Sequence, residues 1–391
     1  MTISPSSNVS PHREALLANA RALAPLLDGS AEEIDAARRL PGHIVAAMKA
    51  AGLFRMSMPA AWGGFEADPI TQNLVIEEVA AANGSAGWCL LIGLSGGYLS
   101  AMLDDEIGRR MYTDPDMISA NAFVPPGAGI EVAGGIRVTG RWPFASGITH
   151  AHWVQAPVLV QDDAGNAVNE VNGQPMRRIV FVPVEDVEII DTWQTTGLKG
   201  TGSCDFAMHD LFVPLERCAN MAAPWKRPGP LYGSFLTGLM NHFGVPLGIA
   251  RRANADFITL VRVKPAKHGI EPPSEASTQI ALAEATATIR AARAYAFSTL
   301  ETAWAHLADG SGLTVEDRIA WRLANAHVHD SCAHAVDLLH HAAGSVSVYL
   351  PNPIDRCWRD IHTARQHGIV AGRVYEKSGH GLLTGDLPPG W

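Results

Sequence analysis

A histidine near the C-terminus is the side chain best suited to proton chemistry. His367 is followed by Gly368 and closes residues 356–368, a segment that also carries Asp360 and His362. An imidazole titrates close to neutral pH, so His367 can orient a substrate, deliver a proton or take one. The alternative is a helix-terminal histidine that stabilises free carbonyls, a role that suits His362 better.

Two further segments place small and hydroxyl-bearing residues beside turns. Residues 142–147 read Trp-Pro-Phe-Ala-Ser-Gly after a strand pattern and include the Ser146 hydroxyl. Residues 193–203 contain three glycines, whose permissive backbone suits a loop that runs close to a ring system. Each segment also fits an ordinary turn, in which the serine satisfies local backbone and the glycines join two strands.

The elements that must position these residues follow a pattern that changes twice along the chain. Residues 1–116 show helical periodicity, residues 117–223 contain short β-branched runs separated by turn clusters, and residues 224–391 return to helices. The sequence therefore predicts a helical N-terminal domain, a middle β-domain and a C-terminal helical domain.

Particular helices are predicted within the outer domains. A capping box is expected to begin at Ser30, and an apolar helix is expected over residues 88–103, where small residues allow close packing. In the C-terminal domain, the patterns at residues 279–308 and 315–343 predict two long helices that suit a bundle.

The composition argues against nucleic-acid and membrane partners. The 391 residues are 47% hydrophobic with a net charge of −9, and lysine and arginine form no run that would follow a phosphate backbone. No apolar stretch reaches the roughly 18 residues of a membrane span, and the first residues lack a signal-peptide pattern. We therefore expect a cytoplasmic protein that binds neither nucleic acid nor membrane.

The spacing of cysteine and histidine predicts no metal. The five cysteines are scattered, without the paired spacing of a zinc site. His327, His334 and His341 would lie about 10 Å apart along a helix, too far to share one ion at ~2 Å ligand distances. Contacts of Asp330 with His334 and of Asp337 with His341 are the expected alternative.

Residues 140–147, 197–203 and 356–368 resemble the acyl-CoA dehydrogenase fold, and within it the oxygenase components of two-component (group D) flavin monooxygenases. The similarity covers residues 31–367. It implies an α+β fold with an N-terminal helical domain, a middle β-barrel or sandwich and a C-terminal four-helix bundle. It also implies a flavin groove that a second subunit completes, and hence a homo-oligomer, usually a homotetramer.

The resemblance implies cofactor contacts residue by residue. In the oxygenases that residues 142–147 resemble, the serine contacts flavin N5, and a hydrogen bond there in a dry site should slow loss of the oxygen adduct as peroxide. The first middle-domain strand would meet the pyrimidine edge, the glycine-rich segment the dimethylbenzene edge, and an arginine the pyrophosphate across a subunit contact. The expected cofactor-binding residues are Asn121, Phe123, Phe144, Ser146, Gly147, Trp193, Thr195, Lys199 and Arg262.

The catalytic base separates two chemistries on this fold. A dehydrogenase needs a carboxylate to remove an α-proton, and the resemblance places it at Gly368 or Gly238, both glycines here. Glu376, the nearest later acid, is expected at the surface. His367 matches the histidine that closes the same motif in the oxygenases, so the expected catalytic residues are Ser146 and His367.

The resemblance also indicates the substrate and the partners. Phenol-hydroxylating members usually have a histidine at about Gly96, and its absence argues for a neutral aromatic, with indole preferred because the chain looks most like the indole-oxygenating branch. FADH2, with FMNH2 as the alternative, and O2 would form a C4a-hydroperoxyflavin that epoxidises indole across C2–C3, towards indoxyl and indigo. An NADH-dependent flavin reductase would supply the reduced flavin by diffusion.

Other functions fit parts of the sequence. An N-oxygenase of an amine or amino sugar and a phenol hydroxylase share the fold and the oxygen chemistry. An acyl-CoA dehydrogenase with a displaced base would bleach its bound flavin with an acyl-CoA, and a non-catalytic scaffold of the same fold would bind no flavin.

Overall fold

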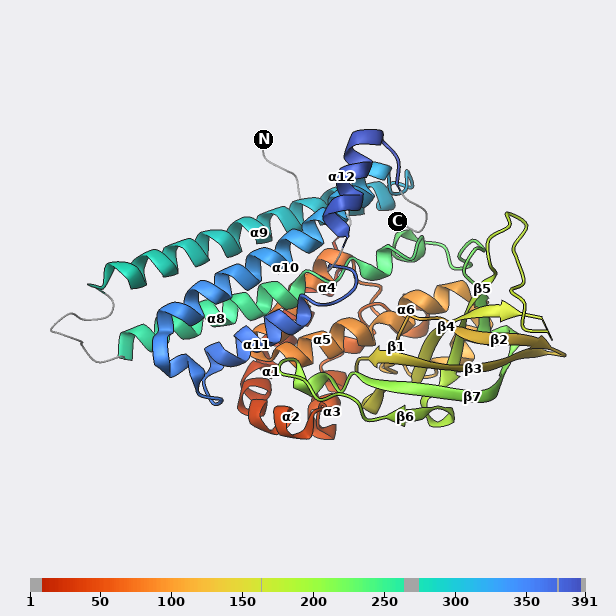
Figure 1. Cartoon of the computed structure of the whole chain (residues 1–391), viewed down its shortest axis with the longest axis horizontal. Coiled ribbons are helices and arrows are strands. Elements are labelled where there is room, and N and C mark those ends of the chain that lie inside the picture. Colours follow the sequence, from red (N-terminus) through yellow and green to blue (C-terminus); the bar gives the residue numbers. More distant parts are fainter. Residues whose placement is uncertain (1–8, 163, 264–273, 371–372, 388–391) are drawn as a thin grey trace.

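The computed structural model describes residues 9–162, 164–263, 274–370 and 373–387. The long C-terminal helices lie on one side and the sheet on the other, with N-terminal helices between them (Figure 1). Within this arrangement α4 packs on α8, and α5 packs on both α8 and the first strand. The predicted α+β class is confirmed, while the predicted domain boundaries at residues 116 and 223 stay predictions.

Polar side chains cap the N-termini of two N-terminal helices, α4 and α5. Asp68 accepts a hydrogen bond from the Thr71 N–H at the start of α4, and Asn83 accepts one from the Ala86 N–H at the start of α5. The α-helices here are α1 (Arg13–Gly29), α2 (Ala31–Ala37), α3 (Gly42–Ala50), α4 (Pro69–Ala82), α5 (Gly84–Gly93), α6 (Ser95–Leu99) and α7 (Asp105–Met111).

Two details predicted for these helices are wrong. Ser30 precedes α2, but its side chain makes no capping hydrogen bond; the capping box lies at Thr314 and Asp317 instead. The helix expected over residues 88–103 is divided into α5, α6 and the 3₁₀ turn η3 (Ser100–Met102). The Ser57 hydroxyl donates to the Leu94 carbonyl at 2.6 Å, which satisfies a carbonyl at the end of α5.

The middle of the chain forms an eight-stranded mixed sheet within the described residues. Its order is β6-β7-β3-β2-β4-β5-β8, and β1 pairs with β4 in parallel. Trp142 stacks on Phe206 inside it, with ring centroids 5.1 Å apart. The strands are β1 (Ser119–Asn121), β2 (Gly127–Val132), β3 (Gly135–Ala145), β4 (Trp153–Gln161), β5 (Arg177–Pro183), β6 (Glu188–Ile190), β7 (Cys204–Pro214) and β8 (Cys218–Asn220).

An irregularity near the end of β3 shapes the region around Ser146. The register against β7 shifts between Trp142 and Ala145. Phe144 lies in this bulge with a φ of 64°, and 68% of its side chain is exposed. The bulge therefore turns an aromatic ring outward two residues before Ser146.

The C-terminal part of the described chain is helical. Its α-helices are α8 (Gly244–Val263), α9 (Ala276–Ala308), α10 (Val315–Ala343), α11 (Pro353–Ala364) and α12 (Val374–Thr384), and α9 and α10 confirm the two long helices that were predicted. The buried Glu77 of α4 ties this bundle to the N-terminal helices, because Arg251 of α8 and Arg293 of α9 both pair with its carboxylate. No helix in the described ranges is long and apolar enough to cross a bilayer.

The contacts expected within α10 are wrong. Asp330 accepts a hydrogen bond from Arg365 at 2.7 Å, and Asp337 bonds His362 at 2.8 Å, in place of His334 and His341. Because α11 packs on α10, it offers these carboxylates better-aligned partners than the next turn of their own helix. His362 is therefore a partner of Asp337 rather than of helix-end carbonyls.

Candidate active site

The Ser146 hydroxyl lies in a buried row of polar groups between the sheet and α5. The Trp88 indole N–H donates to Ser146 Oγ at 3.0 Å, and Ser146 Oγ lies 2.7 Å from Ser203 Oγ. Ser203 Oγ in turn lies 2.7 Å from Thr201 Oγ1. The Gly147 N–H donates to the Thr201 carbonyl at 2.8 Å, so the turn after β3 is fastened to the same loop.

The direction of the hydrogen bonds in this row follows from its last acceptor. Thr201 donates its hydroxyl proton to the Leu198 carbonyl at 2.8 Å. Ser203 must then donate to Thr201, and Ser146 must donate to Ser203, because each hydroxyl has one proton. Ser146 Oγ also accepts from Trp88, which leaves it one lone pair. The free valence of Ser146 is therefore an acceptor.

The Trp88 ring joins Ser146 to His367. His367 lies edge-on to Trp88 with ring centroids 5.4 Å apart, although 279 residues separate the two in the sequence. His242, two residues before the start of α8, also meets Trp88 edge-on at 6.5 Å, and its ring centroid lies 5.6 Å from that of His367. The two residues predicted as catalytic thus flank one indole ring, and a second imidazole completes the group.

These imidazoles are held neutral. Desolvation by burial lowers the pKa of His367 to about 4. Burial also lowers the pKa of His242 well below its ordinary value, and the neighbouring His367 lowers it further. Burial likewise lowers the pKa of His329, on α10, to about 4. At neutral pH the site therefore offers uncharged hydrogen-bonding groups.

The glycine-rich loop after β6 is held by α11. The buried Asp360 carboxylate accepts a hydrogen bond from the Leu198 N–H at 2.6 Å, and Arg359 donates to the Thr196 carbonyl at 2.8 Å. A Cβ on Gly197 would lie 2.0 Å from the Arg359 carbonyl oxygen, so only glycine fits. Burial raises the pKa of Asp360 to about 7, while the Leu198 N–H opposes that rise.

Several predicted cofactor residues gather around this loop. Phe144 and Trp193 are edge-on with centroids 6.3 Å apart, and the Trp193 N–H donates to the Leu198 carbonyl at 3.0 Å. Thr195 and Lys199 line an adjoining pocket of about 440 Å³. Arg38, which pairs with Asp191, and Asp35 line the same pocket. The loop and the exposed Phe144 ring therefore lie next to the buried Ser146.

Three predicted residues lie outside this group. Among the described residues, no hydrogen bond or ring contact joins Asn121 or Phe123 to it; Phe123 meets Phe235 edge-on at 5.2 Å. Arg262 is exposed in the last turn of α8. That end of α8 lies away from the sheet (Figure 1). Within one chain, Arg262 does not approach Ser146.

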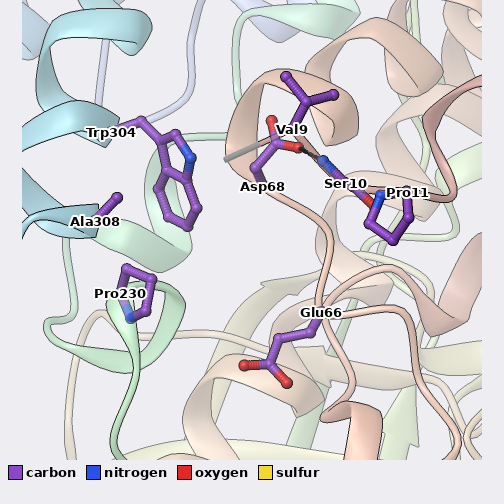
Figure 2. Close-up of a pocket in the computed structure, with 8 residues that line it drawn as sticks. All are labelled: Val9, Ser10, Pro11, Glu66, Asp68, Pro230, Trp304 and Ala308. Atoms are coloured by element: carbon purple, nitrogen blue, oxygen red, sulfur yellow. Dashed lines mark hydrogen bonds between the residues drawn. The ribbon is translucent and has the colours of Figure 1, made fainter. Parts of the chain in front are cut away.

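A second pocket, of about 270 Å³, lies elsewhere (Figure 2). Trp304 and Ala308 of α9 face Ser10 and Asp68 across it, with Glu66 and Pro230 at one side. None of the predicted site residues lines this pocket, so it plays no part in the chemistry described below.

At the two positions where a dehydrogenase would carry its base, the nearest atoms of the described residues include no carboxylate. Nothing in the described chain lies within 4 Å of a Cβ built on Gly368, and Gly238 packs against the Tyr98 ring. Glu376 is exposed and pairs with Arg373. A Cβ on Gly96 would meet Ser119 Oγ at 2.6 Å and the Tyr112 ring at 2.9 Å, so the local packing has no room for a larger residue there.

Comparison with known proteins decides the family. Residues 10–107 and 241–371 match the acyl-CoA dehydrogenase N-terminal and C-terminal domains. An indole-3-acetate monooxygenase from Pseudomonas putida is 30% identical over 96% of both chains. The chain belongs to the flavin-dependent monooxygenases of the acyl-CoA dehydrogenase fold. It is the FADH2-dependent oxygenase component of a two-component system and acts on aromatic compounds.

Two further relatives agree with this monooxygenase assignment. The oxygenase component of a FADH2-dependent resorcinol hydroxylase from a Rhizobium species is 27% identical and covers 90% of each chain. The structure of XiaF from a Streptomyces species, solved with FADH2 and glycerol, superimposes with a TM-score of 0.88 over 96% of each chain at 24% identity. The latter likeness supports the fold.

The donors and acceptors around Ser146 fit a reduced flavin. Reduction converts flavin N5 from an acceptor into an N–H donor, and the hydrogen-bond direction derived above leaves Ser146 Oγ as an acceptor. The exposed Phe144 ring supplies an apolar face, and Lys199 supplies a positive charge in the adjoining pocket, where Arg38 pairs with Asp191 and Asp35 adds a carboxyl group.

Sequence reasoning missed part of this monooxygenase site. The sequence places Trp88 in an apolar helix, and no pattern in it singles out His242 or His329. Asp360 is one residue of the motif at 356–368, and the sequence does not indicate that it holds the glycine-rich loop. His242 lies four residues after Gly238, one of the two positions without a base, and this proximity is the signal that could have identified it.

The buried histidines predict a loss of stability in mild acid. An imidazole whose pKa is lowered on folding stabilises the fold fully above its unfolded value of 6.5, and this contribution declines as the pH falls towards the folded value. For His329, whose folded pKa is about 4, the loss is roughly 2 kcal/mol at pH 5. Urea unfolding at pH 7.5 and pH 5 measures it.

The matched variant is His329→Asn, which can still donate to the Asn325 carbonyl but does not titrate. It is expected to lose less unfolding free energy than the native chain between the two pH values. Asp360, whose raised pKa favours the folded state in acid, is common to both proteins and cancels in the comparison. Equal losses of unfolding free energy in the two proteins would contradict the lowered pKa of His329.

Proposed function

We propose that this monooxygenase oxygenates indole, with epoxidation across the C2–C3 bond as its first step. The observation that carries the proposal is the neutral, aromatic character of the site. Trp88, His242 and His367 meet ring to ring, burial keeps both imidazoles uncharged, and no described carboxylate contacts them. Such a site favours an uncharged, electron-rich ring over a cationic amine.

Two further observations support indole over a phenol. The crowding of Gly96 by Ser119 and Tyr112 leaves no space for the imidazole that would suit ionisation of a phenol. The Pseudomonas putida relative, which is 30% identical over 96% of the chain, is named for an indole derivative.

Reduced flavin with dioxygen supplies the electrophilic oxygen when it is bound. Ser146 accepts the N5–H through its free lone pair, and Trp88 holds the serine in place. His367 orients the substrate or donates a proton beside the transferred oxygen. The remaining contacts to the flavin are assigned to Asn121, Phe123, Phe144, Gly147, Trp193, Thr195, Lys199 and, from a second subunit, Arg262.

The proposed partners follow from this chemistry. An NADH-dependent flavin reductase delivers FADH2, or FMNH2 as the alternative, by diffusion. Arg262 is exposed and distant from Ser146 in its own chain. In a homotetramer it reaches the pyrophosphate of the FAD that a neighbouring subunit binds.

The test is formation of indigo. The purified chain with a flavin reductase, NADH, FAD, air and indole is expected to form indoxyl and then blue indigo, whereas the reductase alone yields only hydrogen peroxide. Incorporation of one atom of labelled dioxygen into indoxyl confirms oxygenation. Turnover of phenols or amines in the same mixture, with indole untouched, would contradict the proposal.

A further inference from the structure

The orientation of His242 is set by a backbone carbonyl. Its Nδ1 lies 2.8 Å from the Leu239 oxygen, and a carbonyl only accepts hydrogen bonds. Nδ1 therefore carries the proton of the neutral ring, and Nε2 carries a lone pair. His242 is 4% exposed, and none of the described residues forms a hydrogen bond with its Nε2.

His367 is the opposite tautomer. Its Nδ1 accepts a hydrogen bond from the Ile369 N–H at 3.4 Å, so in the neutral ring the proton lies on Nε2. The two rings lie 5.6 Å apart, centroid to centroid, at an angle of 37°. The site thus pairs an imidazole acceptor, His242, with an imidazole donor, His367.

A second acceptor lies on the same turn as His242. Gln72 Nε2 donates to the Ala67 carbonyl, which fixes Gln72 Oε1 as an acceptor for the Tyr98 hydroxyl at 2.7 Å and for Asn241 Nδ2 at 3.4 Å. Asn241 Oδ1 is then the free end of its amide, and it has no hydrogen-bond partner in the described chain although it is buried. The turn before α8 is therefore short of donors.

We propose that His242 is a specificity-determining residue whose Nε2 accepts a hydrogen bond from an N–H or O–H group on the aromatic substrate. The inference rests on the proposed function in that it takes the substrate to be aromatic. The ligand completes a hydrogen bond that the described residues leave open, and a ring without such a donor leaves Nε2 without a partner in the complex. Indole belongs to the favoured class, and benzothiophene, with sulfur in place of N–H, does not.

Two substitutions separate the role of Nδ1, which bonds the Leu239 carbonyl, from the role of Nε2 as an acceptor. His242→Asn keeps a donor for the Leu239 carbonyl in the place of Nδ1 but has no atom in the place of Nε2. His242→Gln puts its amide group near the position of Nε2 and can present its oxygen as an acceptor there. Both variants must first show the circular dichroism and the melting temperature of a folded chain.

The measurement is equilibrium dialysis of indole and of benzothiophene against the protein with FADH2 in the absence of oxygen. The native chain is expected to prefer indole, and His242→Asn is expected to reduce that preference about tenfold, the effect of one buried hydrogen bond. His242→Gln is expected to restore part of it. An unchanged ratio of the two dissociation constants in His242→Asn overturns the role of His242.

The same experiment distinguishes this inference from the proposed function. If neither ring binds to the native chain, the aromatic substrate and the role of His242 both fail. If indole is preferred as expected but is never converted to indoxyl, the acceptor role stands and the proposed reaction fails.

Discussion

Ser146→Ala is expected to release most of the oxygen that it consumes as hydrogen peroxide. The hydroxyl proton of Ser146 is committed to Ser203, so its one free lone pair is an acceptor for the N5–H of reduced flavin. Alanine removes this acceptor and also leaves the buried Trp88 N–H unpaired. A lost hydrogen bond in a dry site corresponds to roughly a tenfold rise in peroxide released per product formed.

The measurement is the ratio of hydrogen peroxide to indoxyl at equal consumption of NADH. Ser298→Ala is the matched control, because that hydroxyl bonds a carbonyl of its own exposed helix turn and should leave coupling unchanged. Ser203→Ala frees the Ser146 proton and is expected to give an intermediate ratio. Full coupling in Ser146→Ala would remove the serine from contact with N5.

His367→Ala is expected to lower kcat by about a hundredfold or more, the usual range for loss of a positioned proton donor. Because Nδ1 of His367 accepts from the Ile369 N–H, Nε2–H is the donor that this ring, packed edge-on against Trp88, can offer to a ligand. Binding of FADH2 should change little, since none of the flavin contacts proposed above is assigned to His367. Single-turnover formation of indoxyl, compared with flavin binding, separates the two effects.

The control for this variant is His362→Ala. It removes an imidazole from α11, but that imidazole bonds Asp337. Its turnover should match that of the native chain. A His367→Ala protein with native turnover would exclude the histidine from the active site.

Local patterns in the sequence predicted the order of helices, sheet and helices, whereas the fold class and the candidate site residues come from the family resemblance. Long periodic segments predicted α9 and α10, because apolar spacing over many turns outweighs local exceptions. The failures lie where tertiary contacts decide: Ser57 reaches the end of α5, and α11 supplies the partners of Asp330 and Asp337. The meeting of Trp88 with His367 and the hold of Asp360 on the loop could not be predicted from spacing, since each joins segments far apart in the chain.

The bonds from Arg359 and Asp360 to residues 196–198 also limit how this protein can be divided. A fragment that stops after the last strand would contain every residue of the loop but neither of the groups that shape it. Splitting the gene between the sheet and the bundle should therefore give two halves that regain flavin binding only when they are expressed together.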